Sequence, residues 1–251
     1  MDSRLYDLFF EQEDRHWWFQ GRRRIVLGQV RIWLGWRGGL RILDLGCGTG
    51  GTLQAMRPLG EVWGLDCSRQ ALEYCRRRGL DRLVQGNFPC ALPAAVPAGF
   101  DLITALDMLE HLSDDDGALR HIFRLLRPGG FVLITVPAFA FLWSPHDRAN
   151  HHLRRYTRRQ LSRRLAAAGF RIRKLSYFNF FLFFPAWLRK RCDAWRYGDH
   201  PVSHLEALPP PALGQALLAL FRLEGWLLRK LSFPFGVSLL AVAEKPPTGR
   251  D

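Results

Sequence analysis

A short apolar segment that leads directly into a glycine-rich turn constrains this chain more than any other feature. Residues 41–45 (Arg-Ile-Leu-Asp-Leu) are typical of a buried strand, and residues 46–51 (Gly-Cys-Gly-Thr-Gly-Gly) follow without a spacer. Glycine has no Cβ, so it allows a sharp backbone turn and the close approach of a ligand. A strand followed by such a turn is typical of α/β proteins that bind a ligand at the strand end. We therefore expect a binding site there.

Strand-like and helix-like segments alternate along the rest of the chain. Apolar segments of strand length predict further strands at residues 61–66, 83–86, 100–106, 131–136, 170–177 and 236–243. Apolar residues at helical spacing predict helices at residues 68–78, 113–126 and 157–168, and one amphipathic helical segment at residues 4–36. Residues 127–130 (Arg-Pro-Gly-Gly) predict a turn. The pattern predicts an α/β fold, a Rossmann-like seven-stranded sheet with helices on both faces.

We expect four segments along the chain. An N-terminal helical cover, residues 1–39, precedes the Rossmann-like core, residues 40–178. An aromatic-rich helical insertion, residues 179–235, then precedes the last strand and tail, residues 236–251.

The excess of basic residues says less about partners than its size suggests. The chain has 251 residues and a net charge of +13, but only four of its 36 basic residues are lysine, a bias that a GC-rich genome also produces. Ten basic residues and one acidic residue fall within residues 146–174, so most of the excess belongs to one edge of the molecule. No segment is typical of an RNA-binding module, and no motif for a flipped base follows residues 100–106. We therefore do not expect nucleic acid as a partner.

Cysteine spacing and hydropathy indicate a reducing compartment. The cysteines form neither a C-x-x-C pair nor a cluster with histidine at zinc spacing, so we expect no metal site. They stand at Cys47, Cys67, Cys75, Cys90 and Cys192. The N-terminus lacks the apolar core of a signal peptide, and the longest apolar run, residues 175–188, is too short to span a membrane. We expect a cytoplasmic protein and leave open an association with the cytoplasmic face of a membrane.

The residues around the glycine turn resemble a known family. Residues 42–50 (Ile-Leu-Asp-Leu-Gly-Cys-Gly-Thr-Gly) resemble the first motif of class I S-adenosylmethionine-dependent methyltransferases. The resemblance extends over most of the chain through four later blocks in the same order, at Asp66, residues 86–88, residues 100–112 and residues 126–137. It implies S-adenosyl-L-methionine as the cofactor and transfer of its methyl group by in-line displacement.

The resemblance also implies which residues contact the cofactor. Asp44 and the glycine turn would face the methionine part, Asp66 would accept the ribose hydroxyls, and Asn87 with Phe88 would border the adenine. Aspartate is commoner than Asn87 in the family at that position, but an amide can also donate or accept a hydrogen bond there. The full expected cofactor set is Asp44, Gly46, Cys47, Gly48, Gly50, Asp66, Cys67, Asn87, Phe88, Leu106 and Asp107.

A loop rich in aromatic and polar residues follows the predicted strand at 131–136. Loops at the carboxyl ends of central strands commonly recognise ligands, so we expect the acceptor of the methyl group here. The candidate substrate contacts are Trp143, His151, Arg155 and Tyr156, and the candidate catalytic residues are His111, His146 and His152. In the alternative interpretation this loop only packs against and caps the helix that follows. His111, which follows the predicted strand at 100–106, is in its own alternative a structural cap. Arg154 and Arg155 are the best candidates to contact an anionic acceptor.

Two aromatic segments outside the core have two interpretations each. Residues 16–24, with the blocks at 151–157 and 234–242, resemble a bacterial subgroup of the family that names no acceptor. The aromatic residues 17–19 form either a lid over the cofactor or core anchors. The insertion is either a helical lid or homodimer contact, or an interfacial helix on an anionic membrane, which would suit a lipid-linked acceptor. The aromatic and basic residues of the insertion that suit an interfacial helix are Trp187, Arg189, Lys190, Arg191, Trp195 and Arg196.

We therefore expect a methyltransferase that acts on a small-molecule or lipid-linked acceptor. Two alternatives use the same glycines. A nicotinamide oxidoreductase would bind a dinucleotide at the turn, but it gives no account of the block at residues 126–137. A non-catalytic membrane-peripheral module would keep the fold, although the intact cofactor motif argues against it.

Overall fold

The computed structural model describes residues 3–35, 38–89, 96–197 and 209–247, with the side chains of all these except 3–5 and 192–197. Cys90 lies outside the described residues, and so do the side chains of Cys192, Trp195 and Arg196.

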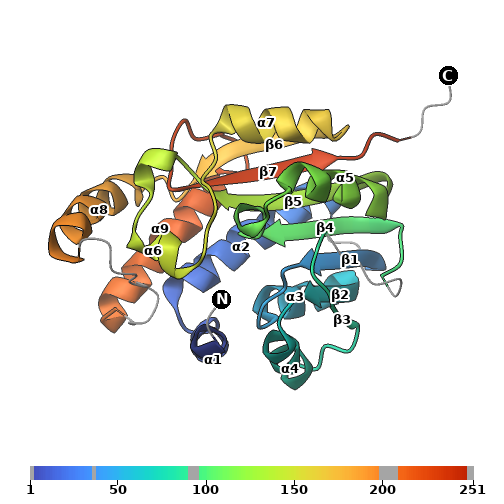
Figure 1. Cartoon of the computed structure of the whole chain (residues 1–251), viewed down its shortest axis with the longest axis horizontal. Coiled ribbons are helices and arrows are strands. Elements are labelled where there is room, and N and C mark those ends of the chain that lie inside the picture. Colours follow the sequence, from blue (N-terminus) through green and yellow to red (C-terminus); the bar gives the residue numbers. More distant parts are fainter. Residues whose placement is uncertain (1–2, 36–37, 90–95, 198–208, 248–251) are drawn as a thin grey trace.

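The described strands form one mixed sheet in the order β3-β2-β1-β4-β5-β7-β6 (Figure 1). The strands are β1 (Leu40–Leu45), β2 (Gly60–Asp66), β3 (Leu83–Gln85), β4 (Phe100–Leu106), β5 (Leu126–Pro137), β6 (Arg171–Phe178) and β7 (Ser238–Glu244). Neighbouring strands from β3 to β5 run parallel, whereas β7 is antiparallel to both β5 and β6. The predicted Rossmann-like sheet of seven strands is thus confirmed.

Strand register brings three acidic residues to one edge of the sheet. Asp44 of β1 lies beside Gly64 of β2 and Thr104 of β4. Asp66 ends β2 and Asp107 directly follows β4. Because parallel strands end together at this edge, it is where open α/β sheets bind ligands.

Helices cover both faces of the sheet (Figure 1). In that view α5 and α7 lie together on one side, and α2 and α9 lie together on the other. Side-chain caps begin α4 and α7, where Ser68 accepts from the Ala71 N–H and Thr157 accepts from the Gln160 N–H. The core helices are α3 (Gly51–Met56), α4 (Arg69–Arg77), α5 (Asp115–Leu125) and α7 (Arg158–Ala167).

The single helical segment expected at residues 4–36 is wrong. The structure has two helices instead, α1 (Ser3–Gln12) and α2 (Trp17–Leu34). His16 is extended and its Nδ1 accepts from the Trp18 N–H, which caps the second helix. Glu13 and Asp14, between the two helices, pair with arginines of α2 and of the core. These pairings hold the chain in a break that helical spacing does not reveal.

The turn expected at residues 127–130 falls within the bounds of β5, which begins at Leu126, and Gly129 there has a φ of 75°. The register to β4 shifts between Phe100 and Leu102, so the strand begins with an irregularity. Gly130 is needed there, because a Cβ would lie 2.8 Å from the carbonyl oxygen of Phe100.

The insertion folds as two helices, α8 (Phe183–Tyr197) and α9 (Pro211–Leu227). The ring of Phe221 on α9 packs edge-on against Trp17 of α2, with centroids 5.5 Å apart, and a Cβ on Gly21 would overlap it. The insertion therefore packs on the N-terminal cover, while the division into four segments remains a prediction. Among the described helices, none is both long enough and apolar enough to cross a bilayer.

Candidate active site

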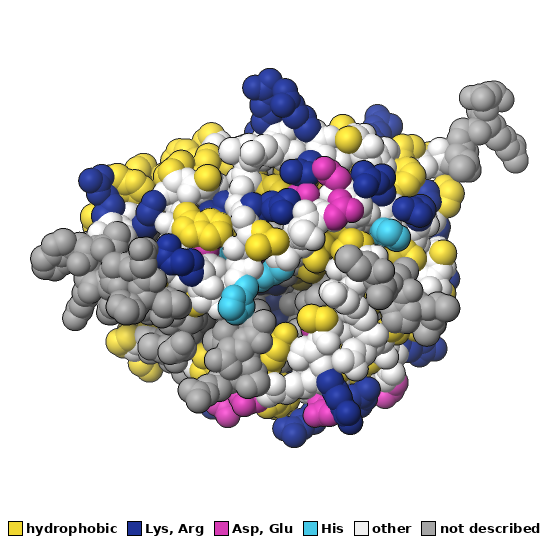
Figure 2. Space-filling view, viewed as in Figure 1, with side chains coloured by type: hydrophobic (Ala, Val, Ile, Leu, Met, Phe, Trp, Pro, Cys, Tyr) yellow, Lys and Arg dark blue, Asp and Glu magenta, His cyan; other side chains and the backbone are white. Residues whose placement is uncertain are grey.

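A cavity of about 620 Å³ opens at the carboxyl edge of β1, β2 and β4. Figure 2 shows the molecule hollowed near the middle of the face in view, with a histidine side chain at the hollow. Ten of the eleven expected cofactor residues line the cavity: Asp44, Gly46, Cys47, Gly48, Asp66, Cys67, Asn87, Phe88, Leu106 and Asp107. Gly50 does not, because its Cβ position faces Cys75 and Leu80 instead.

The glycine turn leaves its cavity side open. Gly46 and Gly48 have φ values of 70° and 54°, a region that favours glycine. A Cβ on Gly46 would lie 2.9 Å from Cγ of Met108, whereas one on Gly48 would meet no atom within 4 Å. Since Gly48 lines the cavity, a ligand can lie against its bare backbone.

Asp66 is fixed by backbone donors. The N–H of Gly48 donates to Oδ2 and the N–H of Ser68 donates to Oδ1, each at 2.9 Å. Burial raises the pKa of Asp66, and these two backbone bonds oppose that rise. The carboxylate is therefore held at the strand end, where the resemblance places the ribose.

Asp44 lies deeper and is almost fully buried. The hydroxyl of Thr104 donates to Oδ1 at 2.6 Å. Burial raises the pKa of Asp44 to about 7, since a charged carboxylate loses its hydration there. A cationic ligand group nearby would favour the ionised form.

The two N-terminal helices and the turn between them contribute residues that sequence reasoning missed. Tyr6, Glu13 and Arg22 line the cavity. Thr49 donates to Oε1 of Glu13 at 2.7 Å, and Arg22 donates to Oδ2 of Asp107 at 2.6 Å. The signal that could have found the first contact is the group of three acids and one glutamine at residues 11–14, which interrupts an otherwise amphipathic segment.

The charges around the glycine turn fit the expected cofactor. Asp44, Asp66 and Glu13 line this part of the cavity, with Arg22 and Arg23 as its cations. Acidic walls suit the cationic sulfonium and ammonium groups of S-adenosylmethionine, whereas a dinucleotide would bring a pyrophosphate dianion. The bare backbone at Gly48 and the oriented carboxylate of Asp66 also fit S-adenosylmethionine.

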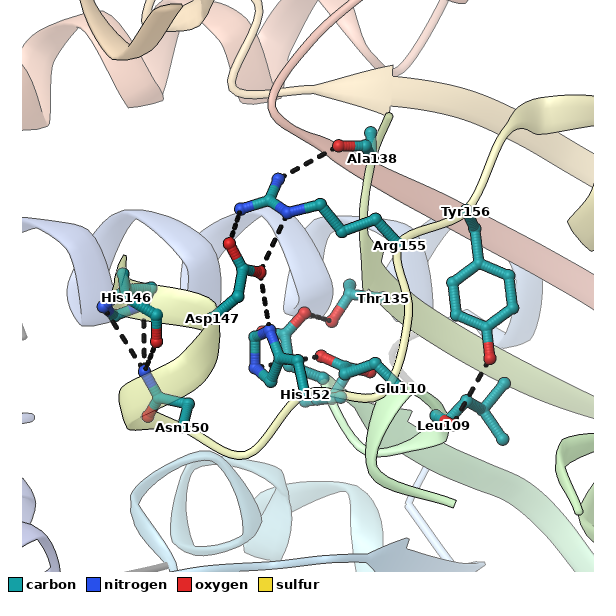
Figure 3. Close-up of polar contacts among 12 residues, drawn as sticks. Leu109, Glu110, Thr135, Ala138, His146, Asp147, Asn150, His152, Arg155 and Tyr156 are labelled. Atoms are coloured by element: carbon teal, nitrogen blue, oxygen red, sulfur yellow. Dashed lines mark hydrogen bonds and ion pairs between the residues drawn. The ribbon is translucent and has the colours of Figure 1, made fainter. Parts of the chain in front are cut away.

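The other end of the cavity carries an ion-pair network centred on Asp147 of α6 (Pro145–Ala149) (Figure 3). Arg155 donates from Nε to Oδ1 at 2.8 Å and from Nη2 to Oδ2 at 2.9 Å, and Nδ1 of His152 donates to Oδ1 at 2.9 Å. Burial alone would raise the pKa of Asp147, but the bonds from His152 and Arg155 hold it well below its usual range. An ionised Asp147 therefore fixes the tautomer of His152.

Glu110 and His111 complete this end of the site. Glu110 is fully buried, and among the described residues neither carboxyl oxygen has a hydrogen-bond partner. Burial and then the charge of Asp107 raise its pKa well above the usual range. Burial, followed by the charge of His152, lowers the pKa of His111 to about 4, so this imidazole is neutral near pH 7. Its ring meets that of His152 edge-on, with centroids 4.9 Å apart.

These three side chains also form a cluster that could hold a metal ion. Glu110, His111 and His152 each offer one ligand atom, and the three atoms lie within 4.8 Å of one another. Cysteine and histidine spacing along the chain gave no sign of it, because the ligands come from two separate loops.

Three of the four expected substrate contacts lie outside the cavity lining: Trp143, His151 and Tyr156. Tyr156 is buried, and its hydroxyl donates to Oδ2 of Asp115 at 2.7 Å. His151 is an exposed turn residue with a φ of 56°. These three side chains lie outside the cavity lining of the described structure, so their contact with the acceptor stays a prediction.

Arg154 and Arg155, the candidates to contact an anionic acceptor, both form ion pairs within the protein. Arg155 lines the cavity, but its guanidinium is neutralised by Asp147. Arg154 pairs with Asp115 at 3.1 Å. Their charges are used within the fold.

The remaining expectations divide between the cavity and the core. His146 lines the cavity, and its backbone carbonyl accepts from the side-chain amide of Asn150 at 2.9 Å. Trp18 and Phe19 line the cavity as a lid would, whereas Trp17 packs on α9 as a core anchor.

Known proteins with similar sequences and structures point to the same class. Residues 10–175 match the family model described as a methyltransferase domain. A ubiquinone biosynthesis O-methyltransferase from Chromobacterium violaceum is 28% identical over 156 residues, which are 55% of this chain and 67% of that relative. The chain spans about half the length of further curated relatives.

Two solved structures place the fold in the same group. An S-adenosylmethionine-dependent methyltransferase from Mesorhizobium loti superposes with a TM-score of 0.58 at 20% identity, over 92% of this chain and 99% of that one. The [4+2]-cyclase SpnF superposes with a TM-score of 0.54 at 26% identity, over 89% and 82% of the two chains. Because one of these structures is a cyclase, the fold alone does not fix the reaction.

The sheet, the glycine turn and the carboxylates at the strand ends of the cavity define a class I S-adenosylmethionine-dependent methyltransferase. Since the family model matches more than half of the chain, this protein belongs to the methyltransferase domain family. Its cofactor is S-adenosyl-L-methionine, and neither the nicotinamide oxidoreductase nor the non-catalytic module is supported.

Proposed function

We propose that this enzyme methylates a hydroxyl group of an apolar small molecule or lipid-linked acceptor, with His152 as the general base. The observation that carries this proposal is the Asp147–His152 pair, because its histidine lines the same cavity as the glycine turn while buried Asp147 holds it from behind. The relative named as an O-methyltransferase supports oxygen as the accepting atom.

The residues at the glycine turn would hold the cofactor. Asp66 would accept the ribose hydroxyls, Asn87 and Phe88 would border the adenine, and Asp44 would face the methionine ammonium group. When bound, S-adenosylmethionine supplies an electrophilic methyl group on a cationic sulfur. Enclosure by α1 and α2 would exclude water from the cavity.

The Asp147–His152 pair would remove the acceptor proton. A hydroxyl is protonated at neutral pH and is a weak nucleophile, so its methylation benefits from a base in hydrogen-bond reach. Oδ1 of Asp147 accepts a hydrogen bond from the N–H at Nδ1 of His152, which leaves Nε2 as the basic atom. Arg155 would keep Asp147 ionised, and so would position the base without touching the acceptor.

The acceptor would lie between polar and apolar walls. Glu110, His111 and His152 line one part of the cavity, and Trp18, Leu112 and Leu142 line another. A protonated Glu110 has a donor and no hydrogen-bond partner among the described residues, with Nε2 of His152 3.9 Å from its Oε1, so it would hydrogen-bond to an acceptor oxygen. Such a site suits a flat apolar molecule with a hydroxyl, for example a phenol or catechol.

We also propose where the enzyme works. A cytoplasmic enzyme that takes an apolar or lipid-linked acceptor meets it at the cytoplasmic face of the membrane. The exposed aromatic and basic residues of α8 support contact with that membrane face.

The proposal is tested by turnover on defined acceptors. The protein is incubated with S-adenosylmethionine and a panel of phenols and catechols with short or long alkyl chains. Mass spectrometry measures O-methyl product, and a coupled assay measures S-adenosylhomocysteine. We expect product from hydroxyl acceptors, a strong loss in His152→Asn, and none from matched methoxy compounds. Methylation of amines or thiols in preference to every hydroxyl acceptor would contradict it.

A further inference from the structure

The helix α8 separates two different environments. Ala186, Arg189 and Lys190 line the cavity. Phe184, Trp187 and Leu188 are exposed, with 64%, 38% and 59% of their surface accessible. The second set lies at positions i, i+3 and i+4 of the helix, so it forms one apolar stripe that turns away from the cavity.

The stripe continues into the loop that follows β5. Phe141 of the 3-10 turn Ala140–Leu142 is 51% exposed. Its ring lies near that of Phe183, with centroids 6.3 Å apart, and Lys190 donates from Nζ to its backbone carbonyl. We call Phe141, Phe184, Trp187 and Leu188 the α8 face.

The charges that follow the apolar stripe are mainly basic. Residues 178–191 contain no Asp or Glu; Arg189, Lys190 and Arg191 follow the stripe, and Asp193 stands two positions further along α8. The guanidinium of Arg191, at position i+7 of the stripe, lies over the ring of Trp187 at 5.3 Å. Figure 2 shows Lys and Arg side chains among hydrophobic ones on the side of the molecule where α8 lies. Aromatic side chains beside cations are typical of helices that lie in a membrane interface.

We propose that the α8 face docks on a bilayer with anionic lipids, so that an apolar acceptor passes from the leaflet along α8 into the cavity. Charge complementarity selects this partner, because each basic residue near an anionic surface strengthens binding about fivefold. The inference rests on the proposed function for the nature of the acceptor, but the docking can be measured without acceptor or cofactor.

The test is flotation of the whole protein with vesicles of phosphatidylcholine alone or with phosphatidylglycerol. We expect flotation with the anionic vesicles only, weakened by salt. Trp187→Glu with Leu188→Glu should reduce the bound fraction more than about tenfold, and Arg191→Glu about fivefold or more. Ile32→Glu is the matched control, because this side chain on α2 is 43% exposed outside the α8 face and should change little.

All variants are first checked for folding by circular dichroism and for binding of S-adenosylhomocysteine. Equal flotation with both vesicle types, or no effect of the α8 variants, would overturn the inference. If sedimentation velocity gave the α8 variants a lower mass than wild type, a second copy of the chain would cover the α8 face in the wild-type protein. This result would also overturn the inference. Failure of the proposed function looks different, since vesicle binding would persist while hydroxyl acceptors were not methylated.

Discussion

Glu224→Gln should stabilise the protein, by an amount that grows as the pH rises from about 4.5 to about 7. Glu224 of α9 is 1% exposed, and its Oε2 accepts from the N–H of Phe180 at 3.1 Å. Burial raises its pKa from 4.5 to about 7, although that backbone bond opposes the rise. Glutamine keeps an acceptor for the same N–H and cannot ionise, so the substitution removes only the cost of the buried charge.

The size of the effect follows from the pKa. A raised pKa means that the folded chain binds more protons than the unfolded chain between about 4.5 and 7, so stability falls as pH rises through this window. Each pKa unit corresponds to about 1.36 kcal/mol. At pH values above both the unfolded and the folded pKa of Glu224, the buried charge therefore lowers the free energy of unfolding by about 3 kcal/mol. Glu224→Gln should therefore match wild type below pH 4.5 and exceed it by up to about 3 kcal/mol at pH 8.

Urea unfolding followed by circular dichroism at pH values from about 5 to 8 measures the difference. Glu73→Gln is the control, because this α4 side chain is 52% exposed and its ion-pair partner in the described part of the chain is the exposed Arg69. A gain that is equal at every pH would refute the reasoning, since it would come from packing and not from a buried charge.

Further substitutions test the site. Asp66→Ala should weaken S-adenosylhomocysteine binding by roughly 1.5 to 3 kcal/mol, because the ribose loses an ionised acceptor; unchanged affinity in isothermal titration would place the ribose elsewhere. His152→Asn should lower kcat roughly 10²- to 10⁴-fold at unchanged cofactor affinity, while His151→Asn, outside the cavity lining, should change neither. Tyr156→Phe should cost about 1 to 3 kcal/mol in urea unfolding without altering KM; a raised KM in the folded variant would return this residue to the acceptor site. Zinc should inhibit turnover by occupying His152, and Glu110→Gln should relieve this; equal inhibition of both proteins would contradict the cluster.

The sheet and the cofactor end of the site could be predicted because they depend on local patterns. A buried strand followed by glycines has one common structural outcome. Asp44 and Asp66 stand at the ends of neighbouring parallel strands, so topology alone brings them to one edge. Gly50 was grouped with the other glycines by motif, although in the structure it serves the turn before α3.

The acceptor end could not be predicted in the same detail. His151 and His152 are adjacent in an irregular loop, and no periodicity tells which of them faces the cavity. The left-handed backbone at His151 and the bond from His152 to Asp147 decide it. Glu13 was missed because its partners, Thr49 and Arg78, lie far along the chain.

Isothermal titration with S-adenosylhomocysteine, compared with NAD, tests the central claim most directly. We expect saturable heat with S-adenosylhomocysteine, competition by S-adenosylmethionine, and no heat with NAD. The absence of heat with S-adenosylhomocysteine at high micromolar concentration, in a protein that circular dichroism shows to be folded, would contradict the assignment of this cavity to a methyltransferase.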